Sequence, residues 1–254
     1  MMLFRRRVEI HTQQNGEVRA ALEDDFHHFR VSIQHEQGIV TFIRGYAVRY
    51  PYTACPGAAM PLEALVGMPL SDVAHSVTRA TDGRHQCTHM LDLAGLAIAA
   101  AARRTHDLIY DVSVPQRTNG RTSPLLWRDG REYLQWQVNG TLIEGPAPYC
   151  GIDLNHGMAA WAINTLKPEE AEAALLLRRC TTISRGREYD LDSVEHAAKT
   201  GLCYSQQPVR AEQALRMKGS TLDFTNHAEQ LCASDQDWFA GLEPNLPLQK
   251  QQNV

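Results

Sequence analysis

Apolar and polar side chains alternate along the first part of the chain. The alternation runs through residues 17–26 and 27–52, and the pairs Asn15-Gly16 and Gln37-Gly38 interrupt it. A repeat of two residues is typical of strands that bury one face, and glycine beside a polar residue is typical of the turns between them. The pattern therefore predicts an antiparallel meander of strands.

A long apolar helix is predicted next. Residues 84–104, with the sequence RHQCTHMLDLAGLAIAAAARR, become almost entirely small and apolar after the first few positions. This composition is typical of a helix that is buried in a core. The stretch before it, 55–73, contains several prolines and glycines and leaves room for one short helix at 62–66.

The second part of the chain repeats this order. Its strand-like stretches are 110–115, 124–140 and 141–146. Asp129-Gly130 is a strong hairpin signal inside the second of them. A helical pattern then covers residues 158–184.

Three helices are predicted towards the C-terminus. Pro168 occupies the first turn of one, whose acidic start and basic end suit the helix dipole. Two shorter helices are predicted over 191–201 and 210–224, closed by Gly201 and Gly219.

These elements predict an α+β fold in which antiparallel sheets pack against helices. We expect residues 1–254 to form a single domain with a flexible tail at 243–254. Both parts of the chain finish a strand block with Pro, Tyr and Cys, so two pseudo-repeated halves at 5–105 and 106–232 are an open alternative. Two such halves would form a crevice where they meet, and ligand sites favour crevices.

Charge and cysteine content argue against several functions. The 254 residues carry a net charge of -4 with a pI near 6.3, so nothing attracts nucleic acid over long range. No apolar signal region follows Arg5–Arg7, and the apolar stretch 93–102 is too short to span a bilayer. The six cysteines contain no C-x-x-C pair and predict no disulfide framework. We therefore expect a cytoplasmic protein that binds neither nucleic acid nor membranes.

Cys87 and His89 flank the predicted start of the long helix. Thr88 is a suitable N-cap, which puts both side chains at the positive end of the helix dipole. That position favours a thiolate and disfavours an imidazolium, so His89 is expected to be neutral and able to exchange a proton. A buried cysteine and a histidine bonded to a backbone carbonyl are the structural alternative.

A second polar cluster, in the string EDDFHHF, combines acidic residues with two histidines. In an extended chain Asp25 and His27 lie on one face and His28 lies on the other. A carboxylate beside an imidazole raises its pKa and fixes its tautomer, as a general base requires. We expect Asp25 to orient His28 as the base and His89 to donate a proton, with a solvated turn as the alternative.

Four residues are candidates for holding a substrate. Arg49 and Tyr52 follow a predicted strand and could bind a carboxylate or a phenolate, although a surface salt bridge would equally explain Arg49. His27 lies beside the expected base. Trp136 could contact an aromatic ligand, but it also alternates with apolar neighbours on one strand face, as a core residue does.

Metal and cofactor chemistry would draw on the same polar residues. His27, His28, His85, Cys87 and His89 supply nitrogen and sulfur donors, but none has the spacing of HExxH. The chain also lacks GxGxxG, the P-loop string and GxSxG, which argues against a dinucleotide fold, a P-loop NTPase and an ordinary α/β-hydrolase. We expect no metal and no cofactor.

The strings LEDDFHHF, RYPYTACPGA, CTHMLDLAGLA and KGSTLDF together resemble a bacterial family called domain of unknown function twenty-eight eighty-nine. The likeness extends over about residues 5–232. The resemblance implies relatives in bacteria that degrade aromatic compounds, with one branch acting on lignin-derived aromatic dimers as a cofactor-independent lyase.

The residues and the resemblance together predict a cofactor-independent acid/base lyase. It would cleave a C–C bond, with release of formaldehyde, in a small hydrophobic aromatic compound such as a lignin-derived dimer. A metal-dependent enzyme with His and Cys ligands and a non-catalytic small-molecule binding module are the alternatives. A homo-oligomer is compatible with the sequence.

Overall fold

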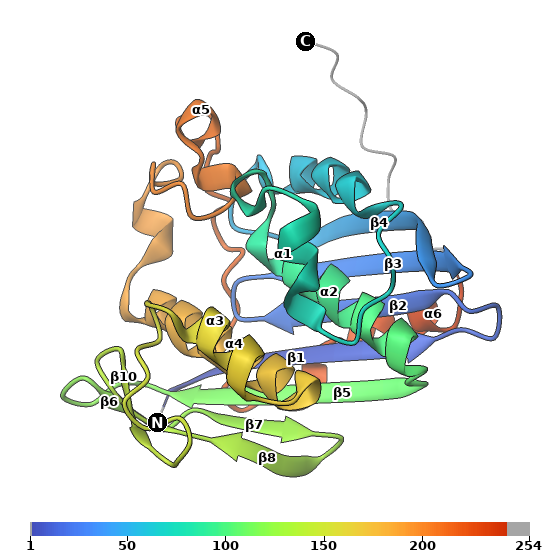
Figure 1. Ribbon diagram of the computed structural model, residues 1–254. Coiled ribbons are helices and arrows are strands. Elements are labelled where there is room, and N and C mark those ends of the chain that lie inside the picture. Colours follow the sequence, from blue (N-terminus) through green and yellow to red (C-terminus); the bar gives the residue numbers. More distant parts are fainter. Residues whose placement is uncertain (1, 243–254) are drawn as a thin grey trace.

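The computed structural model describes residues 2–242, and Figure 1 shows their arrangement. Antiparallel strands form a seven-stranded sheet in the order β4-β3-β2-β1-β5-β7-β8 and a smaller sheet in the order β10-β9-β6. The strands are β1 (Leu3–Thr12), β2 (Val18–Asp24), β3 (His28–Glu36), β4 (Ile39–Arg49), β5 (Asp107–Pro115), β6 (Arg121–Thr122), β7 (Leu125–Arg128), β8 (Arg131–Gln135), β9 (Gln137–Asn139) and β10 (Leu142–Gly145). The predicted α+β class is confirmed, and the predicted tail at 243–254 lies outside the described residues.

Helices cover one face of the main sheet (Figure 1). They are α1 (Val77–Ala80), α2 (Thr88–Arg103), α3 (Met158–Thr165) and α4 (Pro168–Ile183), with a 3-10 helix at Cys55–Leu65. The long helix α2 packs on β2 and β3, whereas α4 packs on β5. The two run antiparallel, because Asp92 near the start of α2 pairs with Arg179, and Arg103 at its end pairs with Glu172.

The central strand of the main sheet, β1, is not predicted by the sequence pattern. Its alternation buries Phe4, Val8 and Ile10 on the face that the helices cover. Arg6 occupies the same face and interrupts the apolar pattern. A buried guanidinium needs a partner, and Asp24 at the end of β2 supplies it.

The C-terminal end of the described chain covers the opposite face of the main sheet. Trp238 in α6 (Gln236–Phe239) shares a small apolar cluster with Ala21, and the Asp235 carboxylate bonds to His28. Because helices cover one face and this segment covers the other, β2 is buried along its whole length.

The segment between α4 and α6 is less helical than predicted. The structure has only a 3-10 turn at Leu191–Ser193 where a helix over 191–201 is expected, and α5 (Pro208–Ala211) where a helix over 210–224 is expected. Alanines dominate the small core cluster of this segment, so a helix here would bury too little apolar surface to be stable. The chain instead forms a backbone bridge within the segment, His196 to Leu215, and another to the residues after β4, Arg216 to Tyr52.

Both parts of the chain contribute to one sheet, because β1 pairs with β5 over nine residues. Each part also supplies a long helix, α2 or α4, on the same face of that sheet (Figure 1). The duplication of two halves stays a prediction. Within residues 2–242, every helix is too short or too polar to cross a membrane.

Gly95 allows α2 to approach a neighbouring 3-10 turn, Ala74–Ser76, very closely. A Cβ atom at Gly95 would lie 2.2 Å from the backbone oxygen of Ala74 and 3.2 Å from Cγ2 of Val77. The glycine therefore fixes the distance between α2 and the turn that carries His75.

We expect Gly95→Ala to destabilise the fold. Alanine favours a helix by about 1 kcal/mol over glycine, but overpacking against an immovable backbone atom costs roughly 1–3 kcal/mol. Urea denaturation should show a net loss of up to about 2 kcal/mol in the free energy of unfolding. Gly83→Ala is the matched control, because no atom lies within 4 Å of its Cβ position. Equal stability of the two variants would contradict this account.

Candidate functional site

A tight hairpin turn joins β2 to β3 and brings Asp24 and His27 together. The backbone N–H of Asp24 donates to the carbonyl of His27 over 2.8 Å, which leaves Asp25 and Phe26 in the loop. Residues opposite each other in an antiparallel pair point to the same face, so Asp24 and His27 both point towards α2. The extended-chain prediction that pairs Asp25 with His27 is therefore wrong, and His28 points to the opposite face of the sheet.

Asp24 is fully buried and holds the ring of His27. Its Oδ1 accepts the backbone N–H groups of Phe26 and His27 at 2.7 Å each and lies 3.0 Å from Nδ1 of His27. Its Oδ2 accepts from Nε of Arg6 at 2.9 Å. Burial alone would raise the pKa of Asp24, but Arg6 and His27 hold that pKa well below its usual value. The carboxylate therefore stays ionised beside the imidazole.

His89 stacks on His27 from the first turn of α2. The ring centroids lie 4.0 Å apart and the ring planes differ by 29°. His89 is buried, and no group among residues 2–242 bonds to its Nε2 atom. Burial lowers the pKa of His89 well below its usual value, and His27 and Arg6 lower it further. His89 is therefore neutral, as the sequence predicts. We call Asp24, His27 and His89 the histidine cluster.

Cys87 differs from its predicted state. It is the N-cap residue of α2, whereas Thr88, the predicted cap, is the first residue of the helix. The Cys87 side chain is buried, and burial raises the pKa of its thiol well above the usual value. Desolvation therefore outweighs the helix dipole, so the predicted thiolate is wrong and Cys87 is a buried thiol.

His28 and Asp25 belong to separate networks. Nε2 of His28 lies 2.9 Å from both carboxylate oxygens of Asp235, on the face that the C-terminal segment covers. Oδ2 of Asp25 lies 3.5 Å from Nε of Arg187. The predicted base, His28, therefore bonds to Asp235 and not to the predicted partner Asp25. It also lies on the opposite face of the sheet from His89.

The remaining predicted residues are dispersed. His27 belongs to the histidine cluster, and the exposed His85 does not. Arg49 donates to backbone carbonyls of the hairpin turn and of the C-terminal segment, so it ties these two parts of the chain together. Tyr52 forms a backbone bridge after β4, and burial raises the pKa of its hydroxyl. Trp136 is fully buried against another aromatic ring in the core.

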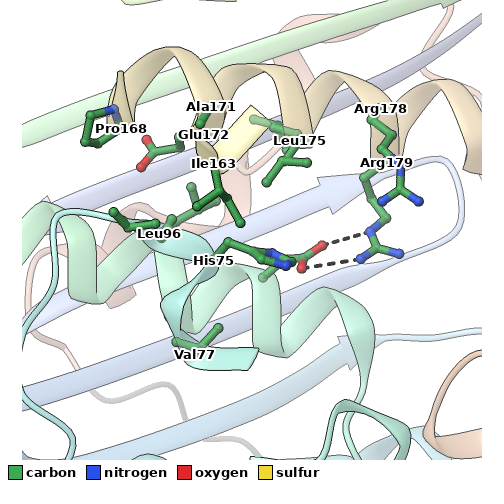
Figure 2. Close-up of a pocket in the computed structure, with 14 residues that line it drawn as sticks. His75, Val77, Leu96, Ile163, Pro168, Ala171, Glu172, Leu175, Arg178 and Arg179 are labelled. Atoms are coloured by element: carbon green, nitrogen blue, oxygen red, sulfur yellow. Dashed lines mark hydrogen bonds and ion pairs between the residues drawn. The ribbon is translucent and has the colours of Figure 1, made fainter. Parts of the chain in front are cut away.

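A cleft lies between α2 and α4, and we call it the helix cleft (Figure 2). The empty space in and in front of the cleft, open solvent at its mouth included, is about 630 Å³. At one end Nε of Arg179 donates to Asp92 over 2.8 Å, and His75 lies beside this pair. His89 precedes Asp92 by three residues on α2, so the two lie on the same side of the helix. The charged end of the cleft is therefore one helical turn from the histidine cluster.

Sequence reasoning misses Asp24 as the orienting carboxylate, although a signal for it exists. Two strand-like stretches separated by only Asp25 and Phe26 are typical of a tight hairpin, which would place Asp24 opposite His27. No comparable signal points to the helix cleft, because α2 and α4 are far apart in sequence.

Residues 5–103 match the model of the family described as "Protein of unknown function (DUF2889)". The resemblance seen in the sequence is thereby confirmed over this segment, which ends with α2 and contains the whole histidine cluster. Helix α4 lies outside it. Searches of curated proteins and of solved structures found no match.

We expect Asp25 to make the fold less stable as pH rises. Burial raises the pKa of Asp25 to about 7, whereas an unfolded aspartate titrates near pH ~4. Between these values the folded state binds the additional proton, so its stability falls with rising pH, by at most about 1.4 kcal/mol per pH unit.

Urea denaturation of wild type and Asp25→Asn across this pH range measures the effect. The asparagine variant lacks the titrating proton, so its stability relative to wild type should improve steadily from acidic to neutral pH. Parallel stability curves for the two proteins would show that Asp25 does not titrate in this range.

Proposed function

We propose that the protein is a cytoplasmic, cofactor-independent acid/base lyase that acts on a small hydrophobic aromatic compound, such as a lignin-derived dimer. The observation that carries the proposal is the histidine cluster, in which a buried carboxylate holds one imidazole and a neutral imidazole stacks on it. Six unpaired cysteines fit a reducing compartment.

His27 is the proposed general base. Oδ1 of Asp24 lies 3.0 Å from Nδ1 of His27, which favours the tautomer with a proton on Nδ1 and leaves Nε2 able to accept one. The ion pair with Arg6 keeps Asp24 ionised, so the carboxylate stabilises the imidazolium that forms when His27 takes a proton. The side chain of His27 is 12% exposed, so a substrate can reach it.

His89 has the complementary role. With the two rings 4.0 Å apart, a positive charge on His27 disfavours a second positive charge on the buried His89. A neutral imidazole retains one N–H group and can donate it as a hydrogen bond. We assign His89 to stabilising the negative charge that develops on the substrate.

The proposed reaction removes a hydroxymethyl group as formaldehyde. His27 takes the hydroxyl proton, the carbon–oxygen bond becomes a carbonyl, and the C–C bond breaks. Its electron pair moves to the neighbouring carbon, which is conjugated with the aromatic ring, and the protonated His27 returns the proton there. Atoms and electrons balance without an oxidant, so this chemistry needs only acid/base groups.

Substitutions of the two stacked histidines test the proposal. His27→Ala and His89→Ala should each lower the rate of formaldehyde release by about 100-fold or more, because each removes one partner of the proton transfer. The assay follows formaldehyde and the second product by mass spectrometry, with lignin-type aromatic dimers that carry a hydroxymethyl side chain.

His85→Ala is the matched control, because this histidine is 67% exposed and lies outside the histidine cluster. It should keep the wild-type rate. Wild-type rates in both cluster variants, with folding confirmed by circular dichroism, would sink the acid/base scheme. Tight binding of a dimer that is recovered unchanged would favour the non-catalytic binding module instead.

A metal-dependent enzyme is the second candidate, and one observation favours it. Ligand atoms of Asp24, His27 and His89 all lie within 4.8 Å of one another, and Nε2 of His89 has no partner in the described part of the chain. Two imidazoles and a carboxylate suit zinc or ferrous iron. However, the guanidinium of Arg6 already pairs with Asp24 and would repel a cation, so we prefer the acid/base assignment.

Metal content separates the two candidates. For the acid/base lyase, the protein purified without added ions should contain much less than one equivalent of zinc or iron by plasma mass spectrometry, and formaldehyde release should persist after exhaustive chelation. One equivalent of metal that is lost in His89→Ala, together with loss of activity on chelation, would establish the metal-dependent enzyme.

A further inference from the structure

The helix cleft has two polar ends and an apolar middle. Figure 2 shows Glu172 at one end and Arg178 and Arg179 at the other, with Ile163 and Leu175 between them. Glu172 and Arg179 are seven residues apart on α4, which corresponds to about 10 Å along the helix axis. An elongated ligand with a polar group at each end and an apolar middle would match this lining.

The arginine end has an uncompensated cation. Arg179 pairs with Asp92, but no carboxylate of residues 2–242 pairs with Arg178. Nε of Arg178 donates to the backbone carbonyl of Leu154. The ring of His75 lines the same end, and burial lowers the pKa of His75, so it adds a neutral polar group. This end therefore suits an anionic group on a ligand.

The opposite end presents a buried hydrogen-bond acceptor. Glu172 accepts from the hydroxyl of Tyr110 and from Nη2 of Arg103, at 2.7 Å each. Its side chain is 1% exposed. A carboxylate has about four acceptor positions, so Glu172 can take a further donor from a ligand in the cleft.

We propose that the helix cleft binds a flat apolar carboxylic acid that carries a hydroxyl group at its far end. The carboxylate lies at Arg178 and the hydroxyl donates to Glu172. A hydroxylated arylpropenoic acid has this chemistry, because its ring and three-carbon chain are apolar and separate the two polar groups. The inference goes beyond the proposed function, because neither His27 nor His89 is among the residues that line the cleft and such an acid carries no hydroxymethyl group to release; equilibrium binding tests it without turnover.

Calorimetric titration with three related compounds tests the two ends separately. The wild-type protein should bind 4-hydroxycinnamate. We expect 4-hydroxycinnamyl alcohol, which lacks the carboxylate, to bind about tenfold or more weakly, and cinnamate, which lacks the hydroxyl, to bind roughly threefold or more weakly.

Matched variants assign each effect to a residue. Arg178→Gln should weaken binding of 4-hydroxycinnamate by about tenfold and leave binding of the alcohol unchanged, because the alcohol makes no charged contact. Glu172→Gln should weaken binding of 4-hydroxycinnamate and leave binding of cinnamate unchanged. Arg185→Gln removes an exposed cation just beyond α4 and should have no effect on any of the three compounds.

The outcomes distinguish this inference from the proposed reaction. Equal affinity for the acid and the alcohol, or no binding of any of the three compounds, would overturn the cleft assignment even if His27-dependent lyase activity is found. Binding with the expected pattern but no lyase activity would establish the cleft assignment and overturn the lyase.

Discussion

The buried ion pair between Arg6 and Asp24 is the interaction on which the rest of the site depends. Both side chains are at most 1% exposed, so removing either partner would leave an uncompensated charge, which typically costs about 3–5 kcal/mol. Because Arg6 lies in the central strand and Asp24 ends β2, the pair fixes the hairpin turn against the middle of the sheet. The same carboxylate orients His27, and His27 stacks on His89. One side chain therefore serves both the fold and the proposed chemistry.

The two histidines that follow this turn show how strongly a sheet separates its faces. His27 and His28 are neighbours in sequence, yet one contacts α2 and the other contacts the C-terminal segment. Asp235 occupies Nε2 of His28, whereas Nε2 of His89 across the sheet has no partner among residues 2–242. A closed hydrogen-bonding network holds a structure together, but only a group with spare capacity can act on a ligand. This difference is why the proposed chemistry is assigned to the face that the helices cover.

The sequence predicts those parts of this fold that depend on local patterns. The meander, α2 and α4 follow from alternation and helical composition. Strand β1 escapes prediction because the buried Arg6 makes its apolar face look polar, and its partner Asp24 is distant in sequence. Sequence reasoning names His27 and His89 as candidates, but it misses Asp24 and the stacking of the two rings. A hairpin turn selects Asp24 over Asp25 for His27, and the C-terminal Asp235 takes His28. The geometry of the turn and partners distant in sequence decide these contacts. The alternation of apolar and polar residues along a strand predicts neither of them.

One face of α2 connects the proposed chemistry with the proposed ligand site. His89, Asp92 and Leu96 follow each other at spacings of three and four residues, so they form a single stripe along the helix. Its first residue stacks in the histidine cluster, and the next two line the helix cleft. The family match ends with α2, whereas Glu172, Arg178 and Arg179 come from α4 outside it. The residues of the proposed acid/base chemistry thus lie in the matched segment, whereas the charged residues of the proposed ligand site that come from α4 lie in the second part of the chain.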